Sequence, residues 1–592
     1  MRRSSSSARC FAAAALPPKP ARPDLEATPS ITYPASSSSN TALLPTFGGS
    51  PANVTYVEQA VPKLDKQTIQ RVKAAAIAAL PADLQASIKS IKTVGPSGFQ
   101  HPSCMVSPAE LAVMKDRLNN GQQPQTMAKD ALLTGKYYAF DAKIAAPKSF
   151  KGWVLPYDTP ATGYAGPYPI EKVCIGYGGS TSLTSFPPVG AAANLPKEAG
   201  SSYQHLAFVE LDSTMAIKQA TAFHATGDSR HAVNAFAIIK AWAATNKSWD
   251  LIGQNGPLEA ACSTRSTPLA SSRHGQQPRN KSWDLIGQNG PLEAAWGIAA
   301  MAKALELLRG RQQFEAVRGQ FLAWNSSVML RQMDHYMNDT LDKVAKGQGL
   351  NLFGNWHSSI VDAYMSLAIL GDDRARYNKA VDLFHRTVKD YVWKWGRDPA
   401  FSKGRRPGEI TETLRDMYHS QFGIGGLLNV AEMAWQQDDD LYCSNQYALV
   451  TAMELHARFV RSALLKDPSL LPPEYAMLDF KQPPFNAAPS NTWAFDIKDQ
   501  VWRCTKDGTS SVLNDPRKFL RDIGFLPAAW EVGYNHFAGR LGLAMPETAA
   551  VLQAYWPEWQ EFHWGLGSLT HGDTAGLLWR AGVNSALQPP AS

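Results

Sequence analysis

The stretch from Gly354 to Arg374, GNWHSSIVDAYMSLAILGDDR, decides the fold. It is an apolar run of helical length that ends at Gly371-Asp372, where glycine can supply a left-handed cap and aspartate can start the next helix. A second helix then contains Ala380-Val381, so the stretch predicts an antiparallel helical hairpin. The same layout occurs earlier, where Gly227-Asp228 precedes Ala232-Val233.

Hairpins of this kind follow one another along the chain, at about residues 200–245, 291–345, 355–395 and 409–466. Such a series predicts a mainly α fold, an incomplete (α/α) toroid built from antiparallel helical hairpins or a bundle, rather than an open sheet. Strands are expected only in short pieces such as Lys172 to Ile175. Ser107-Pro108-Ala109-Glu110 is a capping box that opens a further helix, expected to end near Gly121.

The N-terminal region has the composition of a targeting segment. Residues 1–50 are rich in Ser, Ala and Pro and contain no acidic residue before Asp24, which predicts a disordered leader, either a secretory signal or an organelle transit peptide. Residues 51–100 are assigned to an N-terminal lead-in and 101–580 to the toroid domain. We therefore expect a secreted, periplasmic or extracellular protein, with organelle targeting as the alternative.

A perfect internal repeat interrupts the toroid region. The segment NKSWDLIGQNGPLEAA at Asn246–Ala261 recurs at Asn280–Ala295. Repeats that build a fold drift in sequence, so a single exact copy indicates a duplicated insertion at 246–279, from a recent duplication or a gene-model error. A genuine surface insertion is the alternative.

Composition excludes several classes of protein. The chain of 592 residues carries 58 Lys+Arg and 51 Asp+Glu, a formal net charge of +7, and its hydrophobic residues make up 44%. No apolar run is long enough to span a membrane, and no run of like charges indicates a nucleic-acid partner. Most of the net charge lies in residues 1–50 and 246–279, so a polyanionic partner must be argued from individual side chains.

The six cysteines include no Cys-x-x-Cys motif, which makes a zinc site unexpected. Cys443 and Cys504 flank a Pro-rich stretch and could form a disulfide in an exported protein. Two unrelated buried thiols are the equal alternative.

The first candidate site is Asn355-Trp356-His357, at the expected start of a helix. Free N–H groups and a partial positive charge at a helix N-terminus favour an anionic group there. The alternative is that Asn355 only caps the helix while Trp356 and His357 pack beside it.

A second candidate site is a polar stripe. Glu412, Arg415, Asp416 and His419 fall at i, i+3, i+4 and i+7, one face of an expected helix that also carries Tyr418 and Gln421. A solvated, salt-bridged face is the alternative to a polar face inside a cavity.

The third candidate site is Tyr534-Asn535-His536, followed by Arg540. These side chains handle protons and donate hydrogen bonds, although tyrosine and histidine also serve as ordinary core residues. His563 and His571 add imidazole groups that could line a sugar site.

Several blocks together resemble the alginate lyase domain family of polysaccharide lyases. These blocks are SPAELAVMKDRL, PLEAAWGIAAMAKALELLRG, GNWHSSIVDAYMSLAILGDDR, GEITETLRDMYHSQFGIGGLLNVAEMAWQQDDDLY and WEVGYNHFAGRLG. The resemblance implies an incomplete α/α toroid, a cleft for a polyuronate and β-elimination without metal or cofactor. It also implies that the catalytic Asn-His, Arg and Tyr-His positions of that family correspond to Asn355, His357, Arg415, Tyr418 and His419 in this sequence.

The remaining candidates are expected to bind substrate: Trp356, Glu412, Gln421, Tyr534, Asn535, His536, Arg540 and Asn289.

The hypothesis for the reaction is β-elimination on a 4-linked polyuronate, either alginate or a related glucuronan. Asn355 and Arg415, assisted by His419, would neutralise the uronate carboxylate. His357 or Tyr418 would take the C5 proton and Tyr418 would protonate O4, with Tyr534 and His536 as second candidates.

Two other classes of protein remain open. A toroid glycoside hydrolase would use paired carboxylates, Glu412 with Asp362 or Glu531. A non-catalytic polyuronate-binding protein would bind without any product. In each case the expected partner is an anionic polysaccharide, with no nucleic acid and no membrane span, and the protein is expected to be a monomer.

Overall fold

The structure is a computed structural model. It describes residues 40–47, 54–62, 64–134, 197–245, 290–345, 354–392, 407–410, 413, 417–465, 468–470, 492–496, 501–505, 529–555, 557–558 and 563–587. The strand expected at Lys172–Ile175 and the duplicated insertion at 246–279 lie outside these residues.

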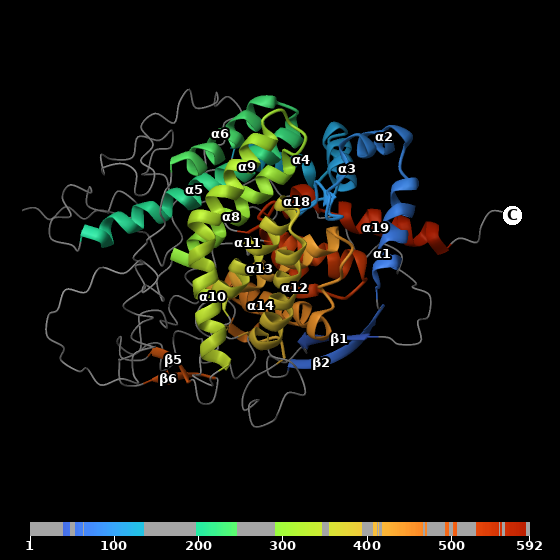
Figure 1. The fold of residues 1–592 in the computed structure, drawn as a ribbon. Coiled ribbons are helices and arrows are strands. Elements are labelled where there is room, and N and C mark those ends of the chain that lie inside the picture. The colour runs from blue at the N-terminus through green and yellow to red at the C-terminus, as the bar shows by residue number, and fades with distance from the viewer. Residues whose placement is uncertain are drawn as a thin grey trace, which may run out of the picture.

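The helices that follow the lead-in pair into antiparallel hairpins, as predicted (Figure 1). Each hairpin has a first helix that faces the middle of the molecule and a second helix outside it. The inner helices are α5 (Lys197–Thr226), α8 (Gly290–Leu307), α11 (Asn355–Gly371) and α13 (Met417–Gln436). Their outer partners are α6 (Ser229–Thr245), the run of α9 (Phe314–Trp324), η5 (Asn325–Met329) and α10 (Leu330–Ala345), of which η5 and α10 contact α8, then α12 (Arg374–Tyr391) and α14 (Ser444–Leu465).

Contacts between inner helices show that they run parallel to one another. On α11 and α13, Asp362 accepts a hydrogen bond from Asn429 at 2.7 Å, and one turn further along both helices Ser366 contacts Met433. Since both positions advance together, the N-termini of the inner helices lie at the same end of the toroid. We call this end the N-terminal end of the toroid.

The same direction holds between α8 and α11. Trp296 donates to Ser359 at 2.9 Å and, farther along both helices, Lys303 pairs with Asp362. α5 packs on α8, α8 on α11, α11 on α13, and α13 on a short helix near the C-terminus. A ring of packed helices with outer partners is an α/α toroid, so the predicted fold class is confirmed.

The lead-in packs against the last helix of the chain and against the toroid. The strands of this N-terminal region are β1 (Asn40–Phe47), β2 (Val54–Val61), β3 (Thr93–Val94) and β4 (Gln100–His101), and its helices are α1 (Lys66–Ala78) and α2 (Ala82–Ile91). α3 (Pro108–Asn119) and α4 (Gln125–Thr134) follow, within the residues assigned to the toroid domain. β1 pairs antiparallel with β2 and packs on α14, and α1 lies beside the C-terminal helix (Figure 1). Residues 40–47 therefore belong to the folded part rather than to the leader.

The remaining elements complete the ring. They are η6 (Pro468–Leu470), β5 (Thr492–Asp496), β6 (Val501–Thr505), α16 (Trp530–Tyr534), η10 (Asn535–Arg540), α17 (Pro546–Tyr555), α18 (Gly567–Thr570) and α19 (Thr574–Leu587). α16 packs on α13, and α18 links α16 to α3 and α4, which in turn contact α5.

Local signals in the sequence explain how the helices begin and end. Ser107 and Glu110 form both halves of the predicted capping box at the start of α3. Gly227, with a φ of 76°, makes the predicted left-handed turn between α5 and α6. The prediction for the later hairpin is wrong by one residue, because Gly371 stays helical and Asp372 takes the left-handed conformation. Aspartate tolerates this conformation, and Asp373 then caps α12.

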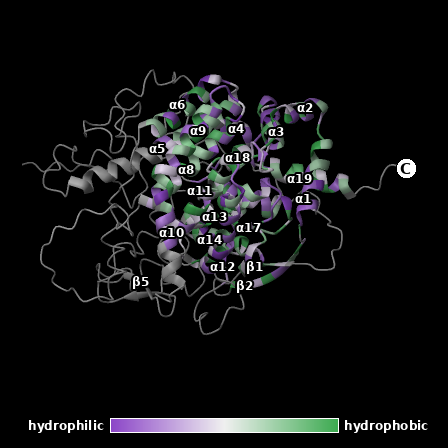
Figure 2. Cartoon of the chain, in the orientation of Figure 1, coloured by the Kyte–Doolittle hydropathy of each residue, from purple (hydrophilic) through white to green (hydrophobic). Residues whose placement is uncertain are grey.

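Hydrophobic residues are spread over many helices rather than gathered in one long apolar segment (Figure 2). One continuous core joins the lead-in to the toroid helices. Among the described residues, no helix is both long and apolar enough to cross a membrane.

Candidate active site

The first turn of α11 forms one wall of the candidate site, at the N-terminal end of the toroid. Gly354 is the N-cap, so the alternative in which Asn355 caps the helix is wrong. Asn355, Trp356 and His357 are the first three helical residues, and all three are buried. The ring of Tyr336 on α10 lies 5.1 Å from that of Trp356 and 5.4 Å from that of His357.

The first turns of α13 form the facing wall. Tyr418 and His419 are the second and third residues of the helix; their side chains lie outside what the structure describes. Gln421 is buried, and its Nε2 has no hydrogen-bond partner among the described residues. A buried donor of this kind is uncommon in a native fold and marks a place where a ligand can bind.

Of the predicted helical stripe, the structure describes only the backbone of His419, in α13. Upstream of this helix, Thr413 lies in a turn in which its amide donates to the Ile410 carbonyl and its side chain accepts from the Ile410 amide. Ile410 also pairs with Val392 in an isolated bridge, which holds the backbone extended there. Glu412, Arg415 and Asp416 lie outside the described residues.

Aromatic side chains line the same end. Trp296 on α8 lies 5.3 Å from Phe422 on α13, measured between ring centroids. Phe422 in turn meets the imidazole of His563 edge-on at 5.9 Å. Flat apolar faces next to buried polar groups are typical of pockets that bind small molecules or sugars.

A buried charged layer lies one to two turns deeper. Asp362 pairs with Lys303 at 2.5 Å and with His563 Nδ1 at 3.3 Å, and none of these side chains is more than 2% exposed. Burial by itself raises the pKa of Asp362, but the charge of Lys303 and the hydrogen bond from His563 outweigh it and lower the pKa to about 2. Asp362 is therefore ionised at neutral pH and can only accept hydrogen bonds.

The ionised Asp362 fixes the state of His563. Burial lowers the pKa of His563, and the hydrogen bond and charge of Asp362 offset only part of this effect, so the imidazole is neutral at neutral pH. Since Asp362 can only accept, Nδ1 carries the proton and Nε2 carries a lone pair. Within the described part of the chain, this Nε2 makes no hydrogen bond.

The third candidate group lies elsewhere. Arg540 is buried and binds Glu432 through two hydrogen bonds of 2.8 and 2.9 Å, and it also pairs with Glu110 at 3.2 Å. His536 stacks on Tyr442 at 3.7 Å and contacts Arg540. Because an α-helix rises about 1.5 Å per residue, Glu432 lies about 21 Å along α13 from Tyr418. The structure thus separates His536 and Arg540 from the walls formed by α11 and α13.

Tyr534 and Asn535 lie between these two regions; Tyr534 is the last residue of α16, which packs against α13, and Asn535 is the first residue of η10. Both are buried, and Asn535 donates to the Glu531 carboxylate at 3.0 Å. Glu531 lies beside Glu558, whose pKa is raised well above its ordinary value by burial and by the charge of Glu531. The pair of Glu531 and Glu558 is separate from Asp362. Because Lys303 keeps the carboxylate of Asp362 ionised, Asp362 is poorly suited as the general acid of a hydrolase.

Glu110, Glu432 and His571 lie close enough together to hold a metal ion. The guanidinium of Arg540 already lies against both carboxylates and supplies the positive charge that the cluster requires. The charge of Arg540 overcomes burial and lowers the pKa of Glu432 well below its ordinary value. The cluster is therefore satisfied as a buried ion-pair network.

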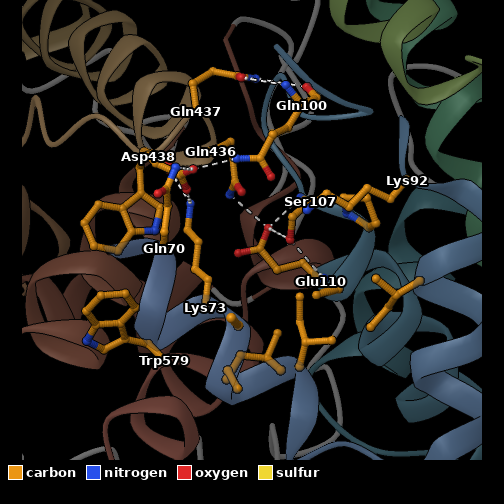
Figure 3. A pocket seen from close by; sticks show the side chains of 18 of the residues that line it. Gln70, Lys73, Lys92, Gln100, Ser107, Glu110, Gln436, Gln437, Asp438 and Trp579 are labelled. Carbon is orange, nitrogen blue, oxygen red and sulfur yellow. Dashed lines mark hydrogen bonds and ion pairs between the residues drawn. The ribbon is translucent and has the colours of Figure 1, made fainter. Parts of the chain in front are cut away.

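A cavity of about 630 Å³ opens next to this network, between α1, α3, α19 and the C-terminal end of α13 (Figure 3). Its polar groups are bonded to one another. Lys73 donates to Asp438 at 2.9 Å, and Gln70 and Gln100 donate to the same carboxylate. Since the cavity lies at the end of α13 opposite Tyr418 and its polar groups already have partners, we do not assign it to the candidate active site.

The structure thus brings together Asn355, Trp356, His357, Gln421 and the backbone of Tyr418 and His419. Asn289 lies outside the described residues, as do Glu412 and Arg415. The sequence reasoning gave no role to Lys303, and it treated Asp362 only as a hydrolase carboxylate. The signal for both was a charged residue within a largely apolar helix, which becomes informative only when the two helices are known to pack together.

The fold and the site together define a class: an α/α-toroid protein whose inner helices direct their N-termini, and hence partial positive charge, toward one polar end. Residues 192–464 match the family model described as Alginate lyase. This match covers part of the chain; it confirms the resemblance to the alginate lyase family and supports a polysaccharide lyase of the alginate lyase type.

No curated protein sequence matches the chain. Among solved structures, alginate lyase A1-III from Sphingomonas species A1 is similar at 14% identity, covering 74% of this chain and 99% of that chain, with a TM-score of 0.34. An alginate lyase from Bacteroides ovatus is similar at 14% identity, covering 61% of this chain and 84% of that chain, with a TM-score of 0.32. Likenesses this distant carry no argument about function, so the family assignment rests on the sequence match.

Proposed function

We propose that the protein cleaves a 4-linked polyuronate, alginate or a related glucuronan, by metal-free β-elimination. The single observation that carries this proposal is the parallel set of inner helices, whose N-termini share one end with Asn355, His357 and the start of α13. Positive helix ends and buried polar side chains in one place suit a substrate that carries a carboxylate on each sugar.

The main electrostatic requirement is to neutralise that carboxylate. Loss of the C5 proton places a second negative charge next to it, and each donor preset for this charge contributes about 3 to 4 kcal/mol. We assign this role to Asn355 and Arg415, assisted by His419. The assignment of Asn355 is supported by its position: it is buried in the first turn of α11, where backbone N–H groups add to its effect.

Two proton transfers complete the reaction. A base takes the C5 proton, the electron pair forms the C4–C5 double bond, and an acid protonates O4 as it leaves. His357 and Tyr418 are the two candidates for the base that the sequence offers, and Tyr418 is the candidate for the acid. Tyr534 and His536 are the second candidates. His536 is less suitable because Tyr442 and Arg540 hold it near the far end of α13.

The test is a screen of alginate, polymannuronate, polyguluronate and glucuronan for the ultraviolet absorbance of an unsaturated uronate end. The lyase proposal expects this absorbance to rise with at least one polymer. New reducing ends without absorbance would instead indicate a glycoside hydrolase, and binding without any product would indicate a binding protein.

Substitutions test the assigned roles. Tyr418→Phe and His357→Ala are each expected to lose activity by about 100- to 10,000-fold, the usual range for a general acid or base. The matched control is His385→Ala, which removes an exposed histidine on the outer helix α12, hydrogen-bonded to Ser444, and should retain activity. Wild-type rates in both site variants would overturn these roles.

We also propose that the protein acts as a secreted or periplasmic monomer, because its polymeric substrate is extracellular and the residues that precede β1 have the composition of a leader. N-terminal sequencing of the protein from its native source, together with its mass in solution, tests this. An intact N-terminus in the cytosol would contradict it.

A further inference from the structure

His563 lies just inside the N-terminal end of the toroid, between the two walls of the candidate site. A side chain added at Gly426 on α13 would lie 3.0 Å from the imidazole Cε1 of His563 and 2.9 Å from Ser358 Oγ on α11. His563 thus fits where α13 has no side chain, next to the residue that follows His357. Its own backbone has a φ of 53°, which is uncommon for a residue other than glycine and often marks functional positions.

The surroundings of this imidazole are those of a general base. Asp362 accepts from Nδ1 and would stabilise the imidazolium that forms when Nε2 takes a proton. Lys303 in turn holds Asp362 in its ionised form. In many unrelated enzymes a histidine acts as a base in this way, oriented by a carboxylate that is itself held in place.

The other charged and polar groups that face His563 are few. The backbone of Phe422 on α13 favours the protonated ring, whereas Lys303 on α8 disfavours it. Asp362 on α11 contributes the largest favourable effect. His357, by comparison, packs against the ring of Tyr336.

We propose that His563 is a further catalytic residue, the general base whose Nε2 takes the C5 proton, with Asp362 as its positioning residue. This inference rests on the proposed function. The C5–H bond breaks, the proton binds Nε2, the electron pair forms the C4–C5 double bond, and O4 leaves with a proton from Tyr418. His357 then remains with Asn355 at the carboxylate.

The experiment uses His563→Gly, because glycine adopts a positive φ without strain and removal of the histidine side chain leaves room for added imidazole. After unfolding temperature and circular dichroism have shown that the variant is folded, kcat and KM are measured on the polymer that the wild type cleaves. We expect kcat to fall about 100- to 10,000-fold with KM within a few-fold, and imidazole to restore activity. Recovery should vary with the pKa of substituted imidazoles, a dependence that the repair of a structural cavity would not produce.

A second variant, His563→Gln, covers the case in which the glycine variant does not fold. The amide can still donate to Asp362 but cannot accept a proton, so kcat should again fall by at least 100-fold. The His385→Ala control should show neither loss nor response to imidazole. If the wild type makes unsaturated uronate while a folded His563 variant keeps kcat within five-fold, the inference fails and the proposed function stands. If the wild type makes no unsaturated product, the proposed function itself fails, and this inference with it.

Discussion

Replacement of Arg540 by methionine should destabilise the protein strongly without altering substrate binding. The guanidinium is 2% exposed, is bound twice by Glu432 and once by Glu110, and stacks over Trp435 at 5.0 Å. Methionine fills a similar volume but carries no charge. The substitution would therefore leave two buried carboxylates close together with no cation between them.

The magnitude follows from the cost of an uncompensated buried charge. Removal of one partner from a buried ion pair costs about 3 to 5 kcal/mol. For a folded unit of about 400 residues, with an unfolding entropy near 2 cal/mol/K per residue, 4 kcal/mol lowers the apparent Tm by about 5 °C. The matched control is Lys379→Met, which removes one side of a half-exposed ion pair with Asp334. A pair of this kind contributes less than about 1 kcal/mol, so the control should lose about 1 °C or less.

The deficit should also depend on pH, in a direction that the structure defines. In the wild type the pKa of Glu432 lies well below its ordinary value, since Arg540 outweighs burial. Without Arg540, burial and Glu110 raise that pKa above the unfolded value, so the folded variant binds a proton that the unfolded chain releases. The variant is therefore least destabilised near pH 5, and its deficit grows toward pH 8.

Differential scanning fluorimetry at pH 5 and pH 8, together with KM on the cleaved polymer, completes the test. A Tm loss for Arg540→Met no larger than that of the control, combined with a raised KM, would falsify the structural role and return Arg540 to the substrate-binding residues. A deficit that shrinks toward pH 8 would show that the charge argument is wrong.

Three further outcomes are expected. Exhaustive treatment with a chelator should leave activity unchanged, because side chains supply every charge in the proposed reaction; activity that is lost and then restored by a divalent cation would contradict this. Burial raises the pKa of Glu454 to about 7, although it accepts from two backbone N–H groups of α17. The folded state therefore binds the proton of the Glu454 carboxyl more tightly than the unfolded chain does, and the free energy of unfolding falls by up to about 3 kcal/mol as pH rises from 4.5 to 7. Glu454→Gln should remove this decrease from the pH dependence of Tm. Gly576→Ala would place a methyl group 2.9 Å from Gly539 Cα and should cost about 1 to 3 kcal/mol, whereas Gly319→Ala, with open space around it, should be neutral or stabilising; equal Tm values would refute the packing argument.

Helical hairpins could be predicted from the sequence because their signals are local. Apolar spacing, the capping box at Ser107 and the turn at Gly227 act within a few residues, and the structure has each of them. The turn at Thr413 and the bridge at Ile410 could not be predicted, for the opposite reason. The pairing of Ile410 with Val392 depends on a residue in another hairpin, and helical spacing in the sequence carries no information about it.

Part of the site could be predicted in the same way, because a helix N-terminus with Asn355 and His357 is a local pattern. The third candidate group shows the limit of this reasoning. Tyr534, His536 and Arg540 look like a functional cluster in sequence, yet Arg540 is bound by Glu432 and Glu110. Those partners lie more than 100 residues away, so only tertiary packing shows that the arginine is already occupied.

The depth of the candidate site follows from the same packing. Below His563 the interior is filled by the layer of Lys303, Asp362 and Asn429, and then by Ser366 against Met433, all of them buried. Among the described residues this layer closes the interior, so we expect a polymer to reach it from the N-terminal end of the toroid, where the inner helix dipoles favour carboxylates. The buried ion pair that closes the interior is also the one that orients His563. Substitution of Lys303 should consequently affect both stability and kcat, whereas substitution of Arg540, at the other end of α13, should affect stability alone.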